Sequence, residues 1–153
     1  MFKKVIVLGV AAGLIASTAL VHAEEHVIQA VITQWRPMVT FAKPGDTLRF
    51  VGMAGHDTET IEGMIPEGAT AWKSKLGEEA FTTTLNKEGA WIFKCSPHMT
   101  TGMVGVVVVG DARPPANLAA LEAALPNIDV GRNMVKRAIT KLKQALETGK
   151  STE

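Results

Sequence analysis

Apolar and polar residues follow different patterns before and after Gly110. Before Gly110, short stretches rich in β-branched residues recur, and each is bounded by Gly, Pro or Asn. Such stretches predict strands, which we expect at 26–34, 47–51, 57–61, 80–85, 90–95 and 103–109. No helical period lies between them to cover a parallel sheet. The pattern therefore predicts an all-β sandwich or barrel.

After Gly110 the pattern becomes helical. Pro114 and Pro115 interrupt the chain, and Asn117 is a candidate cap for a short helix over 118–125. A longer helix is predicted over 132–147, where apolar residues recur three and four positions apart: Val135, Ile139, Leu142 and Leu146. We expect this apolar stripe to dock on the sandwich. The alternative is a helix that lies on a membrane or binds a partner, because its opposite face carries Lys136, Lys141 and Lys143.

The first residues form a third pattern. Lys3 and Lys4 precede an apolar run that ends near Leu20, and the small-residue positions of a cleavage site follow at Val21 to Ala23. This predicts a secretory signal peptide over 1–23 and a mature chain that begins at Glu24. A membrane anchor is the alternative, but a spanning helix needs about 20 apolar residues and this run is shorter. We expect residues 24–110 to form one domain and residues 111–153 to be its helical extension.

Charge and cysteine content narrow the possible partners. Without Lys3 and Lys4 the chain has one more acidic than basic side chain, so nothing favours nucleic acid as a partner. No later stretch is long and apolar enough to span a bilayer, so we expect no stable membrane association after cleavage. Cys95 is the only cysteine, which excludes an internal disulfide. In an oxidising compartment its thiol must be buried or bound.

The loop that begins at Cys95 carries candidate metal ligands. A thiolate, two imidazoles and a weakly bound thioether form the ligand set of a blue-copper electron-transfer site. Cys95 ends one predicted strand, His98 follows in the loop, and Met103 begins the next strand, so one loop can supply three ligands. The second histidine is either His26 or His56. We favour His56, which lies in a glycine-flanked turn between two predicted strands.

Other interpretations of these residues exist. A lone buried cysteine behaves as a small hydrophobic residue, and a methionine beside a valine run is usually part of a core. Met99 competes with Met103 as the thioether ligand, but it adjoins His98 and would have to turn back past its neighbour. Zinc is a second candidate metal, although structural zinc sites are filled by Cys and His without a thioether. Copper therefore fits this set better.

The residues around Cys95 resemble a known family. The stretch "CSPHMTTGM" is similar to the copper loop of the cupredoxins, and its His-to-Met spacing fits plastocyanins and pseudoazurins. The stretches "PGDTLRFV", "GHDTE" and "GMIPEGA" and the tail that begins "GDARPPANL" are similar to pseudoazurins in order and position. Plastocyanins lack such a tail. The chain thus resembles the pseudoazurin family over residues 26–146.

The resemblance implies a Greek-key cupredoxin β-sandwich with two C-terminal α-helices packed on it, residues 24–110 being the copper-binding domain. It implies one type 1 copper ion with the ligands His56, Cys95, His98 and Met103. It also implies a periplasmic electron-transfer protein rather than an enzyme. The expected partners are redox proteins such as a nitrite reductase of denitrification or a c-type cytochrome, in weak transient contact near His98. A periplasmic copper chaperone or storage protein is the alternative.

Two departures from the family pattern lead to further expectations. Asp57 stands where the family usually has Asn, and a carboxylate near copper would favour Cu(II) over Cu(I) and lower the reduction potential. In the family the second histidine ligand emerges in an apolar patch ringed by lysines. We expect Pro97, Met99 and Met53 to supply such a patch. Lysines that can supply a basic rim are Lys43, Lys73, Lys75, Lys87 and Lys94.

Overall fold

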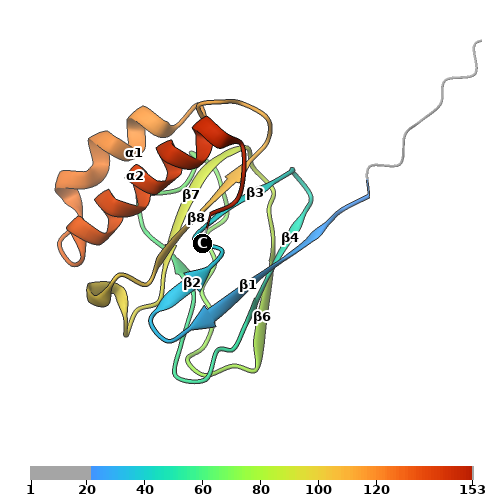
Figure 1. Cartoon of the computed structure of the whole chain (residues 1–153), viewed down its shortest axis with the longest axis vertical. Coiled ribbons are helices and arrows are strands. Elements are labelled where there is room, and N and C mark those ends of the chain that lie inside the picture. Colours follow the sequence, from blue (N-terminus) through green and yellow to red (C-terminus); the bar gives the residue numbers. More distant parts are fainter. Residues whose placement is uncertain (1–21, 153) are drawn as a thin grey trace, which may run out of the picture.

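The fold is a β-sandwich with two helices packed against one of its outer faces (Figure 1). The computed structural model describes residues 22–152. The predicted signal peptide, residues 1–23, lies almost entirely outside the described residues. The structure confirms the predicted sandwich and its two C-terminal helices.

One sheet contains the first two strands of the described chain. Its members are β1 (Glu25–Val31), β2 (Gln34–Arg36), β4 (Thr47–Val51) and β6 (Ala80–Thr84). They lie in the order β2-β1-β4-β6. Strand β1 runs parallel to β4, whereas β2 and β6 pair antiparallel with their neighbours. The start of β1 therefore lies beside the start of β4.

The second sheet carries the loop of Cys95. Its members are β3 (Val39–Ala42), β5 (Glu59–Thr60), β7 (Gly89–Lys94) and β8 (Val104–Val109), in the order β3-β8-β7-β5. Strands β3 and β8 are parallel, and β7 is antiparallel to both β5 and β8. The loop between β7 and β8 thus joins two paired strands at one end of the sandwich.

Strand β8 separates two hydrophobic clusters. All six of its residues are buried. Val107 and Val109 face the space between the sheets, which is filled largely by aromatic side chains: Trp35, Phe50, Trp72, Trp91 and Phe93. Val104, Val106 and Val108 belong to the cluster beneath the helices. A strand buried on both faces has a continuous apolar sequence, which explains the four consecutive valines from Val106 to Val109.

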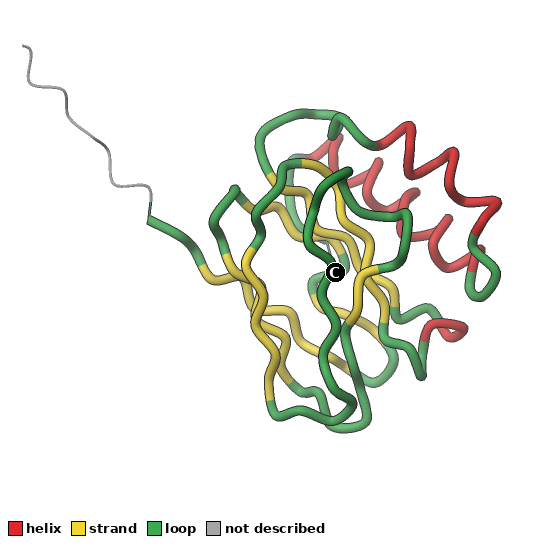
Figure 2. The backbone as a smooth tube through the Cα atoms, turned by 180° about the vertical axis from the view of Figure 1, so that it is seen from behind, coloured by secondary structure: helices red, strands yellow, loops and turns green. Residues whose placement is uncertain are grey.

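The two C-terminal helices are α1 (Leu118–Ala124) and α2 (Arg132–Thr148), with a short 3-10 turn, η2 (Leu125–Asn127), after α1. Both lie on the same side of the sandwich (Figure 2). In α2, Val135, Ile139 and Leu142 are buried and Leu146 packs beside them, so the predicted docking of the stripe is confirmed. Among residues 22–152, no helix has both the length and the apolar character that crossing a bilayer requires.

The structure differs from the sequence prediction at three places. The stretch 26–34 is not one strand, because the chain turns at Ile32, whose φ is 56°, and returns as β2. No Gly or Pro marks that turn. Strand β3 was not predicted. Asn117 occupies the N-cap position of α1 as predicted, but its side chain makes no capping hydrogen bond. The side chain instead accepts a hydrogen bond from Ala90 N–H and donates one to Ala90 O, each 2.8 Å long.

Candidate metal centre

The loop of Cys95 is closed by its own backbone. Cys95 N–H donates to Met103 O at 2.9 Å, and Met103 N–H donates to His98 O at 3.1 Å. His98 N–H donates to Cys95 O at 3.2 Å. A single turn of 3-10 helix, η1 (Met99–Thr101), fills the loop and ends at Gly102, whose φ is 103°. These bonds hold the main chain of Met103 next to both Cys95 and His98.

His56 approaches from the other sheet. It follows β4 after a turn in which His56 N–H donates to Met53 O at 2.8 Å. Gly55 adopts a φ of 77° in this turn, a conformation that favours glycine. On the far side, Gly77 N–H donates to His56 O at 2.8 Å. The imidazole is thereby fixed at the end of the sandwich where the Cys95 loop lies.

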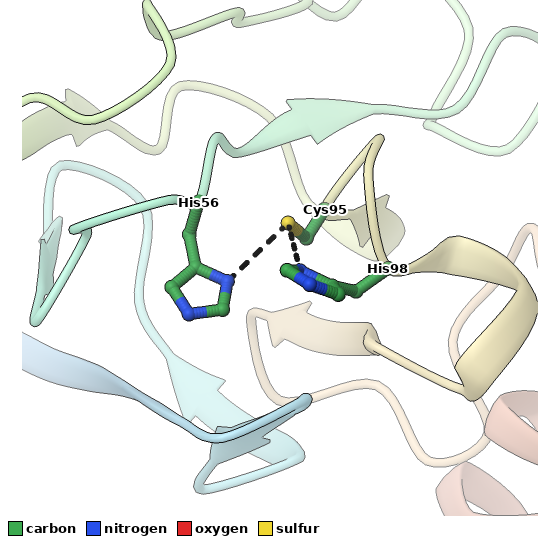
Figure 3. A group of neighbouring side chains, drawn as sticks. All are labelled: His56, Cys95 and His98. Carbon is green, nitrogen blue, oxygen red and sulfur yellow. Dashed lines mark hydrogen bonds between the residues drawn. The ribbon is translucent and has the colours of Figure 1, made fainter.

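Three side chains converge at this end (Figure 3). The Cys95 Sγ lies 3.6 Å from His56 Nδ1 and 3.5 Å from His98 Nδ1. The two imidazole rings are 4.8 Å apart between centroids. Cys95 is fully buried, His56 is nearly so, and His98 is partly exposed. A sulfur and two nitrogens thus face one point, and one of the imidazoles reaches the surface.

Burial controls the protonation of this group in the metal-free protein. It raises the pKa of the Cys95 thiol, so the thiol keeps its proton at neutral pH. Burial, together with the nearby His98, lowers the pKa of His56, so that imidazole is neutral. A metal ion that binds here must displace the thiol proton, whereas His56 already offers a lone pair.

Two carboxylates join the His56 and Cys95 loops. Asp57 Oδ1 accepts a hydrogen bond from Ser96 N–H at 2.6 Å, and Glu59 Oε1 accepts one from Ser96 Oγ at 2.9 Å. Glu59 also binds Lys73 at 2.8 Å and Lys94 at 2.9 Å. Burial opposes the ionisation of Glu59, but these hydrogen bonds outweigh it and lower the pKa to about 2. The role of Glu59 was not foreseen from the sequence.

The methionines near the centre occupy different clusters. Met103 is fully buried in the same cluster as Cys95. Met99 belongs to the cluster under the helices, where a Cβ on Gly131 would lie 2.8 Å from its Cγ. Met99 and Met53 are only 5% and 1% exposed, so the prediction that they form an apolar surface patch was wrong. Their thioethers fill gaps inside the protein, and Pro97 alone of the three is exposed.

The other predicted surface and ligand residues have separate places. His26 Nε2 lies 2.9 Å from Asp46 Oδ2, beside the start of β4, so His26 is at the opposite end of that strand from His56. Lys73 and Lys94, two of the five lysines of the expected rim, are bound to Glu59. Lys43 follows β3 and Lys87 precedes β7, both at the end of the sandwich away from Cys95, so the prediction that these two belong to a rim around His98 was wrong. The structure thus brings His56, Cys95 and His98 together and leaves His26 apart.

Comparison with known proteins gives consistent matches. The family profile "Copper binding proteins, plastocyanin/azurin family" matches residues 25–110. A pseudoazurin of Methylorubrum extorquens is 45% identical over 92 residues, 60% of this chain and 60% of its own. One from Paracoccus pantotrophus is 42% identical over 91 residues, 59% of this chain and 61% of its own. The chain therefore aligns with less than two thirds of the length of these two relatives.

A solved structure extends the match to the helices. The structure of a pseudoazurin from Sinorhizobium superposes with a TM-score of 0.67 at 36% identity, covering 83% of this chain and 99% of that one. The paired sheets, the helical tail and the convergence of one cysteine and two histidines are consistent with this likeness. The chain belongs to the plastocyanin/azurin family of copper-binding proteins, and within it to the pseudoazurins.

Proposed function

We propose that this protein is a periplasmic electron carrier whose single copper ion is held by His56, Cys95, His98 and Met103. Copper is the metal of the family. The observation that carries the proposal is the convergence of one sulfur and two imidazole nitrogens at a buried point. Residues 24–110 form the copper-binding domain in this proposal, and residues 111–153 are its helical extension.

The donor set fits copper in a type 1 site. Both imidazoles turn Nδ1 toward the Cys95 sulfur, so two nitrogens and, once the thiol has lost its proton, a thiolate would be available to one copper ion. The burial of Met103 in the same cluster as Cys95 supports it as the weak thioether ligand, whereas Met99 packs elsewhere. When bound, copper supplies one-electron exchange between Cu(I) and Cu(II).

The protein part of the mechanism is to hold the donors still. The turn at His56, the closed loop from Cys95 to Met103 and the link from Asp57 to Ser96 fix the ligand positions from both sheets. Little therefore has to move when the charge of the site changes. Burial excludes water from the sulfur, and the partly exposed His98 joins the site to the surface. His98 thus provides a route by which an electron can reach a partner.

A small contact around His98 would suit a carrier. Redox partners such as a nitrite reductase or a c-type cytochrome must bind and leave quickly, and weak contacts of limited area permit this. Exposed Ser96 and Pro97 directly precede His98 in sequence and give such a face. This face does no bond chemistry, so we propose no enzymatic activity for the protein.

Copper storage is less well supported. A Cu(I) store would favour clustered, accessible methionines. In the described chain most methionines are buried and only Met134 is partly exposed; the buried ones are Met38, Met53, Met64, Met99 and Met103. The single converging site fits electron transfer better.

The first test is the absorption spectrum of the exported protein. The full chain is expressed with its own leader, recovered from the periplasmic fraction and titrated with Cu(II). We expect one copper per chain and an intense thiolate-to-copper band that a mild reductant bleaches and that Cys95→Ser abolishes. A colourless protein that retains only Cu(I) would favour storage, and recovery in the cytoplasm alone would refute the location.

A matched pair of variants tests the fourth ligand. Met103→Leu removes a thioether from the cluster of Cys95, whereas Met99→Leu removes one from the cluster under the helices. We expect only Met103→Leu to shift the absorption band and raise the reduction potential. If Met99→Leu produces the shift and Met103→Leu does not, the assignment is reversed.

A further inference from the structure

A second group of potential ligands lies at the start of β1. Glu24 N–H donates to Asp46 Oδ1 at 2.8 Å, and His26 Nε2 lies 2.9 Å from Asp46 Oδ2. Ligand atoms of Glu24, His26 and Asp46 all lie within 4.8 Å of one another. Both hydrogen bonds end on one carboxylate, so the Glu24 nitrogen and the His26 ring lie on the same side of the chain.

Asp46 fixes which ring nitrogen of His26 carries hydrogen. The Asp46 side chain is only 5% exposed, and it also accepts Lys43 N–H at 2.8 Å. A carboxylate only accepts hydrogen bonds, so His26 donates its Nε2–H. The lone pair of the neutral ring is then on Nδ1. A carboxylate that holds one nitrogen of a histidine while the other binds metal is the usual outer-sphere arrangement at metal sites.

Cleavage after Ala23 changes the chemistry of this group. In the precursor the Glu24 nitrogen is an amide, but in the mature chain it is a terminal amine. His26 then becomes the third residue of the sequence Glu24-Glu25-His26. The amine, the amides of Glu25 and His26, and His26 Nδ1 are four nitrogens that can surround one ion in a plane. Cu(II) and Ni(II) prefer such square-planar nitrogen sets.

We propose that the mature N-terminus is a second metal site, in which the Glu24 amine, the two following amide nitrogens and His26 bind Cu(II) or Ni(II). This inference rests on the predicted cleavage and is independent of the proposed electron transfer. The carboxylates of Glu24 and Glu25 add negative charge near the ion. Both groups can keep their hydrogen bonds to Asp46 when the metal binds. A metal-bound amine still has two N–H groups, and the imidazole binds through Nδ1, which leaves Nε2–H free for Asp46.

Binding requires a local rearrangement. The two amides lose their protons to water, and the first residues leave their register with β4, in which Glu25 pairs with Thr47 and His26 with Leu48. No strand of the described chain pairs with the other side of β1 here, because β2 pairs only with Gln29 to Val31. The end of a strand frays at low cost. The segment can therefore adopt the planar arrangement while Asp46 keeps its hydrogen bonds to the Glu24 nitrogen and to His26 Nε2.

This site lies away from the Cys95 centre. Strand β4 starts beside the N-terminal residues and ends at Val51, which leads into the turn of His56 (Figure 1). The length of the sandwich therefore separates the two groups. Metal at the N-terminus should leave the thiolate-to-copper band unchanged.

The test uses the exported, processed protein with Cu(II) already in the Cys95 centre. Mass spectrometry of the intact protein first establishes that it begins at Glu24. Ni(II) is then added during calorimetry and absorption spectroscopy. We expect one further equivalent to bind with proton release and a weak ligand-field band, while the thiolate band stays constant. The same binding should persist in Cys95→Ser, which lacks the other centre.

The decisive control inserts one alanine before Glu24. It keeps every side chain of the group but moves His26 to the fourth position from the amine, so we expect the added equivalent to be lost. His26→Gln should lose it too, and Asp46→Asn should weaken it roughly 10- to 100-fold. Binding that survives the insertion would show that side chains alone hold the metal and would overturn the proposal. Cleavage at another bond, or no binding by the processed chain, would also overturn it.

Discussion

At the residue scale, Asp57 lies next to the proposed ligand His56 and braces the loop of Cys95. Its Oδ1 accepts Ser96 N–H at 2.6 Å, and the residue is only 8% exposed. We predict that Asp57→Asn raises the reduction potential by roughly 50–100 mV, because the negative charge goes while an amide oxygen still accepts the bond. Redox titration of the copper-loaded proteins measures this. An unchanged reduction potential would show that the charge of Asp57 does not influence the copper ion.

Glu59 should make stability depend on acid pH. Its pKa is about 2 in the folded protein and 4.5 ordinarily, so its ionised form stabilises the fold fully above pH 4.5. That stabilisation, at most about 3 kcal/mol, is lost as the pH falls from 4.5 toward 2. We predict that Glu59→Gln lowers the free energy of unfolding at neutral pH, and that the difference from the parent closes over this range.

Urea unfolding at a series of pH values tests this prediction. Exposed Glu62→Gln is the matched control, since it removes a surface carboxylate from the same region without touching Lys73 or Lys94. If the difference in unfolding free energy between the parent and Glu59→Gln stays constant from neutral pH to pH 2, the carboxylate acts only through packing.

The sequence was sufficient to bring His56, Cys95 and His98 into one hypothesis, because a lone cysteine and the loops that flank it offer few combinations. It was not sufficient to place Glu59. Its partners Lys73 and Lys94 are distant along the chain and look like ordinary surface lysines. Met99 was misplaced for a similar reason. Whether a methionine faces water depends on the segments that pack over it. Met99 is covered by the chain at Gly131, just before α2.

At the scale of elements, the contact between α2 and β8 holds the tail on the sandwich. Leu142 is fully buried in the cluster that also contains Val106 and Val108. We predict that Leu142→Ala lowers the free energy of unfolding by about 2–5 kcal/mol, through lost burial and a residual cavity. Exposed Gln144→Ala on the same helix should change it by less than about 0.5 kcal/mol. Equal effects in urea denaturation would mean that α2 is not part of the cooperative core.

Elements were predictable where the pattern was strong and local. The valine run of β8 and the stripe of α2 are such cases. Strand β3 and the turn at Ile32 were not, because β3 is short and gains its order from pairing with β8, and the turn lacks Gly or Pro. Asn117 shows the same limit: its amide satisfies the main chain of Ala90, a partner that only the tertiary structure brings near.

At the scale of the whole molecule, the exposed end beside His98 should govern exchange with partners. We predict that Pro97→Glu slows electron transfer to a redox partner by about tenfold, because a new charge must be desolvated in the contact. Its absorption spectrum should stay unchanged. The control is Lys87→Glu, because Lys87 precedes β7 at the opposite end of the sandwich. This substitution should have little effect on the rate of electron transfer. Stopped-flow kinetics compares them, and equal slowing would place the contact elsewhere.

The fold class was predictable at this scale, but the order of the strands was not. Repeated short strands and turn residues indicate a sandwich without saying which strands become neighbours. In this protein β1 joins β4 and β3 joins β8, both in parallel. Parallel neighbours cannot be joined by a tight turn, so local sequence carries little information about them. The Greek-key topology was predicted only by the resemblance to pseudoazurins, not by the pattern of apolar and polar residues.

The parallel pairing of β3 with β8 also affects how quickly the chain can fold. Strand β3 lies near the beginning of the described chain and β8 follows the Cys95 loop, so the sheet cannot close until most of the polypeptide has been made. Folds dominated by such distant pairings form slowly, on the order of milliseconds to seconds. A newly made chain therefore spends an interval without its sheets. For a protein that we propose to be exported, that interval leaves time for an unfolded polypeptide to cross a membrane.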